Sequence, residues 1–355
     1  MRELFYPKGK SHRQWGQIHG ETYREEIQML ADLRVYLART IGGFANDEAV
    51  LSVAGEHIAP LKAFSGDLHG ELLGIAEGAN ISAEKVVVLN HYTDLRDLGP
   101  AVTAQDGGCT VLYAKTKNGP VLAQTWDMHA SAIPYVMLLH TPGVEGAPGA
   151  SLLSLTGCLG MAGLNDHGVG VAINNLASND ARVGVVWSAL VRKALLARTS
   201  KEARPVFAKE NIGSGHHYLV ADAQDVFALE TSGTESEEVY SGTEKVFCHT
   251  NHCLNKRVGE KSRVSPVSTT YSRLTAIEKS TSDRPVESAM DAYERMGSQE
   301  GFPGSICTNQ TTPETPHAPA TCGAISLDLK KREMLCVAGF PHNVAPKKIV
   351  IGANR

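Results

Sequence analysis

The chain has 355 residues, of which 42% are hydrophobic and 20% charged, and its formal net charge at pH 7 is -4. This balance is typical of a globular protein with one large or two ordinary domains, and it gives no reason to expect nucleic acid or an anionic membrane as a partner. The seven cysteines form no CxxC pair, which indicates a reducing compartment. Because the N-terminus shows neither a signal-peptide pattern nor a membrane span, we expect a cytoplasmic protein.

The first 108 residues are predicted to form a helical layer. Between residues 21 and 41 apolar side chains recur every three or four residues, which is typical of an amphipathic helix. The same periodicity predicts helices over 45–61, 67–80 and 82–98. Ser82 is suited to cap the last of these helices, since its hydroxyl can accept a free backbone N–H.

From Cys109 onward the pattern changes to short apolar runs that are typical of strands. The runs 111–114 and 121–124 flank a turn with an Asn-Gly pair, which predicts a β-hairpin. Further strands are predicted at 136–139, 152–155, 169–173, 218–221, 226–230, 245–248, 324–327 and 334–337, and helices at about 188–199 and 286–296. Many strands with segregated helices predict an α+β fold.

Two connections rich in Gly, Pro and Thr, 142–149 and 309–319, are predicted to be exposed or to border a pocket.

The Gly108-Cys109 bond lies where the helical part meets the first strand. If this bond is cut, Cys109 gains a free α-amine that can act as base for its own thiol. Glycine at 108 would let the backbone adopt strained dihedrals during attack by the thiol. The hairpin returns Asp127 toward Cys109, where a carboxylate can hold the new ammonium. Without cleavage, the segment at 107–109 would be a Gly-Gly turn before a buried cysteine. Asp127 would then be a turn residue at the end of a strand.

Gly-Gly-Cys-Thr at 107–110, the hairpin and Gln-Thr-Trp-Asp at 124–127 resemble the maturation site of the acyl-coenzyme A:isopenicillin N (6-aminopenicillanic acid) acyltransferase family. These are the C45 peptidases of the N-terminal-nucleophile (Ntn) hydrolase superfamily. Further similar segments follow in the family's order, at 13–20 with Arg24, 163–165, 168–174, 249–252, 271–273, 305–307 and 339–341. The resemblance implies a four-layer αββα sandwich and cleavage between Gly108 and Cys109. Residues 1–108 and 109–355 would then remain together as one domain, with higher oligomers open.

The resemblance also implies roles for individual residues. Cys109 would be the nucleophile, Asp127 would hold its amine, and the Asn251 side chain would donate to the oxyanion. Support for substrate or oxyanion is implied for Asn174, Arg273 and Thr308. The alternatives are a turn asparagine at 251, a sheet-edge cap at 174 and a solvated arginine at 273.

One departure concerns the acyl acceptor. Penicillin-forming members have an arginine after Ser-Ile-Cys, whereas this chain has Thr308. A fixed cation that could meet a substrate carboxylate is therefore missing at that position.

A cluster of histidines suggests zinc as an alternative. A tetrahedral site needs three or four converging ligands, which an extended segment does not ensure. We therefore expect no metal and no other cofactor, and we interpret as structural residues His216, His217, His249, His252 and Cys253.

These observations predict a self-processing cysteine amidohydrolase that cleaves the amide of an N-acyl small molecule through a thioester acyl-enzyme. One alternative is an acyltransferase that moves an acyl group from acyl-CoA or an amide to a small amine. A second alternative, from another class, is an unprocessed relative without enzymatic activity. The residues leave open which acyl group and which amine are used.

Overall fold

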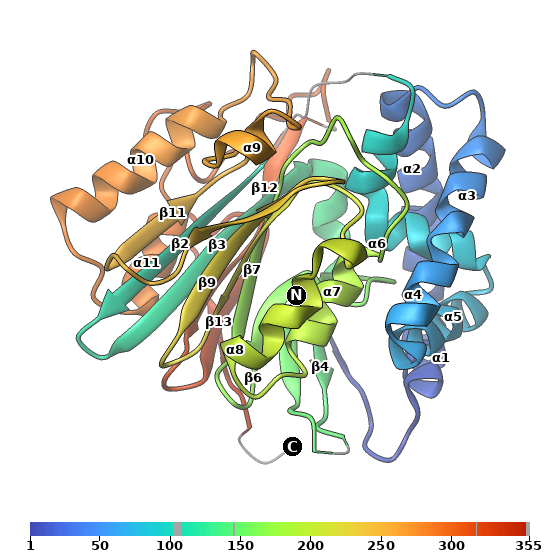
Figure 1. Ribbon diagram of the computed structural model, residues 1–355, viewed down its shortest axis with the longest axis horizontal. Coiled ribbons are helices and arrows are strands. Elements are labelled where there is room, and N and C mark those ends of the chain that lie inside the picture. The colour runs from blue at the N-terminus through green and yellow to red at the C-terminus, as the bar shows by residue number, and fades with distance from the viewer. Residues whose placement is uncertain (102–107, 145, 317, 353–355) are drawn as a thin grey trace.

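The computed structural model describes residues 1–101, 108–144, 146–316 and 318–352. Two β-sheets pack face to face, because β2 and β3 of one sheet contact β7 of the other (Figure 1). The larger sheet has eight strands, in the order β1 (Arg2–Phe5), β4 (Val136–Thr141), β5 (Ala150–Leu155), β6 (Ala162–Asn165), β7 (Gly170–Asn175), β8 (His216–Ala221), β9 (Val226–Thr231) and β10 (Ser236–Tyr240). The smaller has six, in the order β11 (Val246–His249), β2 (Cys109–Thr116), β3 (Gly119–His129), β12 (Pro319–Asp328), β13 (Glu333–Ala338) and β14 (Lys347–Val350).

Helices lie on both sides of the paired sheets. The six-stranded sheet is covered by α10 (Thr270–Asp283) and α11 (Ala289–Met296), and the N-terminal helices lie on the opposite side of the molecule (Figure 1). The prediction of an αββα sandwich is therefore confirmed. The other helices are α1 (His12–Thr22), α2 (Arg24–Gly42), α3 (Asp47–Glu56), α4 (Ile58–Phe64), α5 (Gly66–Ala79), α6 (Ala83–Leu98), α7 (Trp187–Ala194), α8 (Ser200–Ala203) and α9 (Lys256–Gly259).

The N-terminal helices agree with the sequence periodicity except in two places. The predicted helix over 45–61 is two helices, α3 and α4, joined at His57. The sequence did not predict α1, which packs against α5 through glycines. A Cβ on Gly16 would lie 2.0 Å from the Glu71 carbonyl oxygen, and one on Gly74 would lie 2.1 Å from that of Arg13. This contact brings two backbones together without an apolar stripe, so periodicity gives no signal for it.

The predicted hairpin is present and sets the position of Cys109. β2 and β3 pair in register from Thr116 opposite Gly119 to Cys109 opposite Trp126. Side chains alternate between the faces of a strand, so Cys109 shares a face with Val111 and Tyr113. Those residues belong to the main apolar core, whereas Leu112 belongs to the cluster under α10 and α11. The thiol therefore lies on the inner side of the six-stranded sheet.

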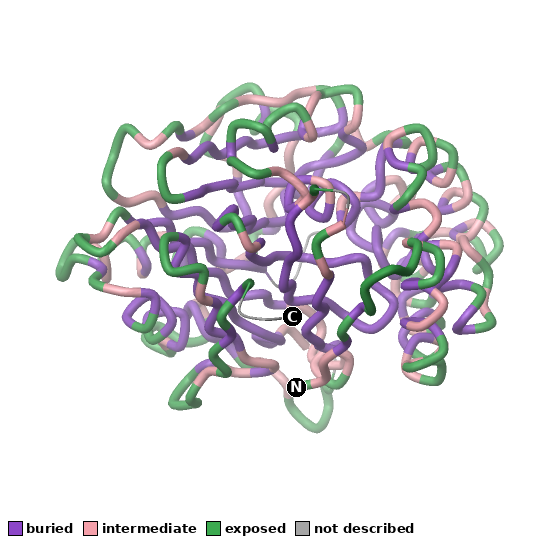
Figure 2. Tube along the Cα trace, turned by 90° about the horizontal axis from the view of Figure 1, so that it is seen from below, coloured by how far each residue is buried: buried purple, intermediate pink, exposed green. Residues whose placement is uncertain are grey.

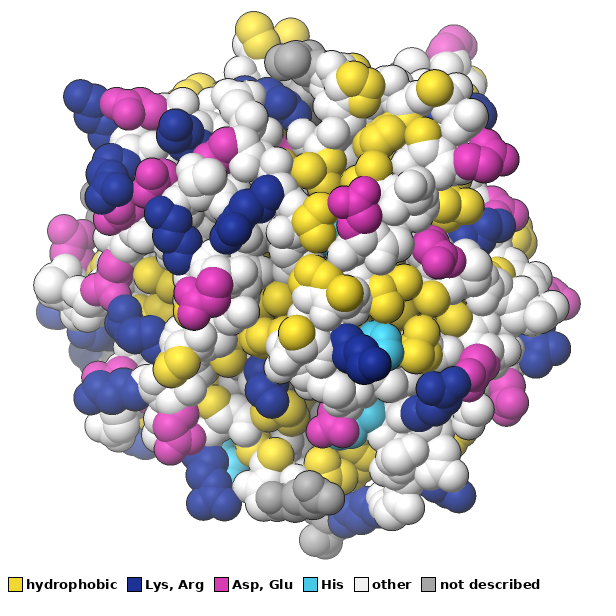
Figure 3. Space-filling model, turned by 45° about the vertical axis from the view of Figure 1, so that its right-hand side comes forward, with side chains coloured by type: hydrophobic (Ala, Val, Ile, Leu, Met, Phe, Trp, Pro, Cys, Tyr) yellow, Lys and Arg dark blue, Asp and Glu magenta, His cyan; other side chains and the backbone are white. Residues whose placement is uncertain are grey.

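Burial and charge follow this layering. The strands in the middle of the molecule are buried and the exposed residues lie at its periphery (Figure 2). On the face shown in Figure 3, acidic and basic side chains are interspersed. Among the helices that the structure describes, none has the length and apolar character needed to cross a membrane.

Candidate active site

Cys109 is the first residue of β2 and lines a cavity. Its side chain is 6% exposed. Burial and the nearby Asp127 charge raise the pKa of the thiol to about 12, although the backbone N–H groups of Asp127 and Asn175 and the Arg273 charge favour the thiolate. In the uncut chain the thiol is therefore protonated at neutral pH, and its proton must leave during attack.

The peptide bond before Cys109 is already polarised by a backbone donor. The N–H of Asp127 donates to the Gly108 carbonyl oxygen over 2.6 Å. An oxyanion formed by attack on the Gly108 carbon would develop on this same oxygen.

Glycine at 108 is required for space in the uncut chain. Gly108 is not among the glycines with left-handed φ. A Cβ there would lie 2.2 Å from Arg273 Nη2 and 2.4 Å from Asn251 Oδ1. Close packing against the arginine is thus one reason for glycine at 108, and the strained dihedrals expected during attack by the thiol stay a prediction.

Asn251 accepts hydrogen bonds from two donors beside Cys109. Its Oδ1 receives the Cys109 N–H over 2.7 Å and Arg273 Nη2 over 2.9 Å. Its Nδ2 donates to the Asn175 carbonyl over 2.9 Å. Because two donors meet one atom, that atom must be the amide oxygen. In the uncut chain the Asn251 side chain therefore holds the nitrogen of Cys109 through its oxygen, while its Nδ2 donates to the Asn175 carbonyl.

Arg273 lies buried in α10 and also binds the backbone of Cys109. Its side chain is 1% exposed, so the alternative of a solvated arginine is wrong. It donates to the Cys109 carbonyl over 2.7 Å, to Thr110 Oγ1 over 3.2 Å and to Thr269 Oγ1 over 3.1 Å. Burial lowers its pKa, and the opposing charge of Asp127 partly restores it.

Asn174 holds the Cys109 carbonyl from the other sheet. Its Nδ2 donates to that carbonyl over 3.0 Å, and its Oδ1 accepts from His217 Nδ1 over 2.7 Å and faces His249 Nδ1 at 3.2 Å. The other His249 nitrogen lies 2.8 Å from Glu230 Oε1. Two of the histidines considered as zinc ligands, His217 and His249, thus take part in this hydrogen-bond network. In the part of the chain that the structure describes, no group of three or more His, Cys, Asp or Glu residues could hold a metal ion.

Asp127 is buried next to Cys109 and accepts a hydrogen bond from Thr321 Oγ1 over 2.8 Å. Burial raises the pKa of its carboxyl to about 6, against the effects of Arg273 and Thr321. The Cys109 N–H donates to Asn251 instead, so an Asp127 contact with the amine stays a prediction for the cut chain. Thr308 bonds to Thr321 through its backbone and does not line the cavity.

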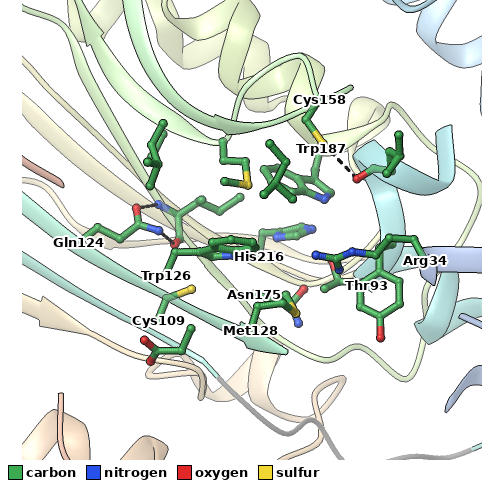
Figure 4. Close-up of a pocket in the computed structure, with 18 residues that line it drawn as sticks. Arg34, Thr93, Cys109, Gln124, Trp126, Met128, Cys158, Asn175, Trp187 and His216 are labelled. Carbon is green, nitrogen blue, oxygen red and sulfur yellow. Dashed lines mark hydrogen bonds between the residues drawn. The ribbon is translucent and has the colours of Figure 1, made fainter. Parts of the chain in front are cut away.

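The cavity lies between the ends of the two sheets and the helices α2 and α6 (Figure 4). Its lining is mostly apolar and includes Leu153, Leu155, Met161 and Ile173 from the eight-stranded sheet and its connections. Residues 1–108 supply one wall, made of Arg34, Leu89, Tyr92 and Thr93. The described residues of connections 142–149 and 309–319 do not line it.

Sequence reasoning missed Arg34 and Asn175 in this lining. Arg34 follows Leu30 by four residues and precedes Ala38 by four, so it interrupts the buried stripe of α2. A charged residue in such a stripe is a signal for a paired or functional group. Asn175 follows Asn174 in a strand, so the two amides face opposite sides of the sheet.

The fold and site define an αββα protein in which a strand-initial cysteine is held at both its nitrogen and its carbonyl by buried amides. The sequence model of the acyl-coenzyme A:6-aminopenicillanic acid acyl-transferase family matches residues 114–339. The chain belongs to this family, and the family prediction is confirmed.

Individual relatives show more distant similarity. The chain is 28% identical over 240 residues to the 40 kDa form of acyl-coenzyme A:6-aminopenicillanic-acid-acyltransferase from Emericella nidulans. The matched region covers 67% of this chain and 66% of the relative. Penicillin V acylase from Agrobacterium tumefaciens is 14% identical with a TM-score of 0.43, covering 68% of this chain and 84% of its own. A mutant of conjugated bile acid hydrolase from Clostridium perfringens is 10% identical with a TM-score of 0.45, covering 68% of this chain and 92% of its own.

Proposed function

We propose that this protein is a self-processing amidohydrolase with Cys109 as N-terminal nucleophile. The observation that supports this most directly is the hydrogen bond of 2.6 Å from Asp127 N–H to the Gly108 carbonyl oxygen, next to a thiol that faces an apolar cavity. Family membership and the acyltransferase relative support an enzyme that acts on acyl groups.

In the first step the Cys109 sulfur attacks the Gly108 carbon. The C–S bond forms, the C–N bond breaks, and the Cys109 nitrogen takes a proton and becomes a free amine. Asp127 is the carboxylate whose charge acts on the thiol, and with a pKa of about 6 it is ionised at pH 7 and can accept the thiol proton. Water then hydrolyses the thioester, which leaves a Gly108 carboxylate and the Cys109 thiol.

In the second step the same sulfur attacks the acyl carbon of a small amide. The amine leaves with a proton from the Cys109 α-ammonium, and water releases the acid from the thioester. Asn251 Oδ1 holds the α-amine, as it holds the N–H of the uncut chain. The Asn175 backbone N–H, which already faces the sulfur, donates to the oxyanion.

Transfer of the acyl group to an amine is the second candidate function, since the relative from Emericella nidulans is an acyltransferase. Both functions need the same thioester and differ only in whether water or an amine receives the acyl group. We propose hydrolysis because Thr308 provides no cation for a penicillin-like acceptor. We further propose that residues 1–108 and 109–355 stay assembled, since both line the cavity, and that the protein is cytoplasmic.

Intact-mass spectrometry under denaturing conditions tests the first step. Wild type should yield two pieces, 1–108 and 109–355, that elute together without denaturant, and Cys109→Ala should stay whole. Cys158 also lines the cavity, and its thiol donates to the Leu89 carbonyl over 3.2 Å. Cys158→Ala should therefore still cut. A wild-type chain that stays whole after prolonged incubation, or a Cys109→Ala chain that is cut, would contradict self-processing.

A panel of N-acyl amines, with and without acyl-CoA, tests the second step. We expect acid release and a transient acyl mass on the piece 109–355. Formation of a new amide only when acyl-CoA is present would support the acyltransferase instead.

A further inference from the structure

Arg34 is a buried cation that faces the cavity. Its side chain is 4% exposed, and its guanidinium lies 4.5 Å from the centre of the Tyr92 ring. Figure 4 shows it directed toward the space between α2 and Cys109, which lies on the other side of that space. The structure as described gives Arg34 neither a hydrogen-bond acceptor nor a carboxylate.

Two other buried arginines each have a carboxylate partner. Arg192 lies 3.0 Å from Glu71 Oε2, and Arg295 lies 3.1 Å from Asp291 Oδ2. A guanidinium removed from water without an anion is unfavourable, and burial accordingly lowers the pKa of Arg34. The Tyr92 ring compensates only part of this cost. An anion that enters the cavity would compensate more of it.

The lining of the cavity defines the charge and shape of that anion. The lining of the cavity includes Leu89, Leu155, Met128, Trp187 and His216, and Arg34 is the only lysine or arginine among the described residues that line it. A single guanidinium matches a monoanion, and its planar fork matches a carboxylate. We therefore infer, on the basis of the proposed function, that the natural substrate has a carboxylate at the far end of its acyl chain, which Arg34 binds while Cys109 attacks the amide.

The acyl part fits this position better than the amine part. The acyl group stays on the sulfur while the amine leaves and water enters, so the leaving group needs the path to solvent. Arg34 is held away from bulk solvent, where a group that stays bound is expected. The apolar walls between Cys109 and Arg34 suit the methylene groups of such a chain.

Matched p-nitroanilides test the inference through kcat/KM. One series has acyl chains that end in a carboxylate, and the other has chains of equal length that end in a methyl group. We expect wild type to prefer the carboxylate at the best chain length by about 10- to 100-fold, the range of a charge-assisted hydrogen-bond pair. Arg34→Met should bring this ratio close to one, and Arg34→Lys should keep part of it.

Arg39→Met is the matched control. Arg39 is on the same helix but lies at the surface, 3.1 Å from Asp47, so this variant should keep the wild-type ratio. Equal ratios in wild type and Arg34→Met would overturn the inference. A preference that appears only when the carboxylate is on the amine part would also overturn it.

A binding measurement separates this inference from the proposed hydrolysis. Titration calorimetry on the uncut Cys109→Ala chain uses N-methyl amides of the same acids. We expect the carboxylate-ended amide to bind more tightly than the methyl-ended one, and Arg34→Met to remove the difference. If neither anilide series is turned over but this difference is present, hydrolysis is wrong and the carboxylate site stands. Equal binding of the two amides would overturn the carboxylate site whatever the enzyme does.

Discussion

Two buried arginines lie near Cys109, and they differ in what surrounds them. Arg273 comes from α10, and its hydrogen bonds run to the Cys109 carbonyl, Thr110, Thr269 and Asn251. Arg34 comes from α2 and lies over the face of Tyr92, with no hydrogen-bond acceptor among the described residues. A buried cation with all these protein acceptors fixes the geometry of its neighbours. One that faces a cavity without an acceptor is placed to bind a ligand.

The same contrast holds for the two sides of the cavity. On the side of Cys109 the polar groups satisfy one another through Asn174, Asn251 and Arg273. On the helical side the wall is apolar apart from Arg34 and Thr93. We propose that the first side carries out the chemical step and that the second selects the substrate.

The largest effect is expected from Arg273→Met. This substitution removes one of the two side-chain donors to the Cys109 carbonyl and leaves Asn251 Oδ1 with a single donor. We expect the free energy of unfolding to fall by about 3 to 5 kcal/mol, as for other broken buried charge networks, and self-cleavage to stop. Urea unfolding in the Cys109→Ala background measures the first effect. A loss below about 1 kcal/mol would show that the network around Arg273 is not a structural anchor.

Two substitutions of Asn251 distinguish its two candidate roles. If the Asn251 side chain donates to an oxyanion, Asn251→Ala and Asn251→Asp should both lower kcat by about 10²–10³. If the Asn251 side chain instead accepts from the Cys109 nitrogen, as in the uncut chain, Asn251→Asp keeps an acceptor oxygen and Asn251→Ala loses it. We expect Asn251→Asp to be cut at close to the wild-type rate and Asn251→Ala to be cut much more slowly. The time course of fragment formation tests the acceptor role, and kcat on an amide substrate, measured on chain that has been cut, tests the donor role.

Asp127→Asn should have an effect on stability that depends on pH. The pKa of Asp127 rises from its usual 3.8 to about 6 through burial, so the folded chain binds this proton more tightly than the unfolded chain. Its charge therefore costs stability as the pH rises from about 4 to 6, and the cost is complete above pH 6. In the Cys109→Ala background, Asn at this position should raise the free energy of unfolding by about 2 to 3 kcal/mol at pH 7.5 and by little at pH 4. An equal gain at both values would mean that Asp127 is not protonated in this range.

The smallest effect on stability is expected from Arg34→Met. No hydrogen bond or ion pair of the described residues is lost, and a buried charge without an anion is removed. We expect the free energy of unfolding to be unchanged or to rise by about 1 kcal/mol. Thermal unfolding of Cys109→Ala with and without this change measures it. A clear fall in the free energy of unfolding would show that the stacking of Arg34 on Tyr92 stabilises the fold, as the hydrogen bonds of Arg273 are expected to do.

The sequence predicted the features that depend on local pattern. The hairpin places Asp127 beside Gly108, and the cap at Ser82 begins α6, because turn and cap residues act on their near neighbours. The family resemblance added the layered sandwich. Contacts between distant segments were not predictable in this way. The burial of Arg273 depends on how α10 packs against β11 and β2, and the orientation of Asn251 depends on which donors meet it.

The first strand of the chain has a consequence for what a cut at residue 108 would do. β1 adds to the edge of the eight-stranded sheet in parallel with β4, and Glu3 there pairs with His140 and Lys347. The excised piece would thus remain bound to the other at its beginning, far from the new chain ends. Activation would then be a covalent event with almost no change in size or shape, invisible to sedimentation or gel filtration and detectable only once the protein is unfolded.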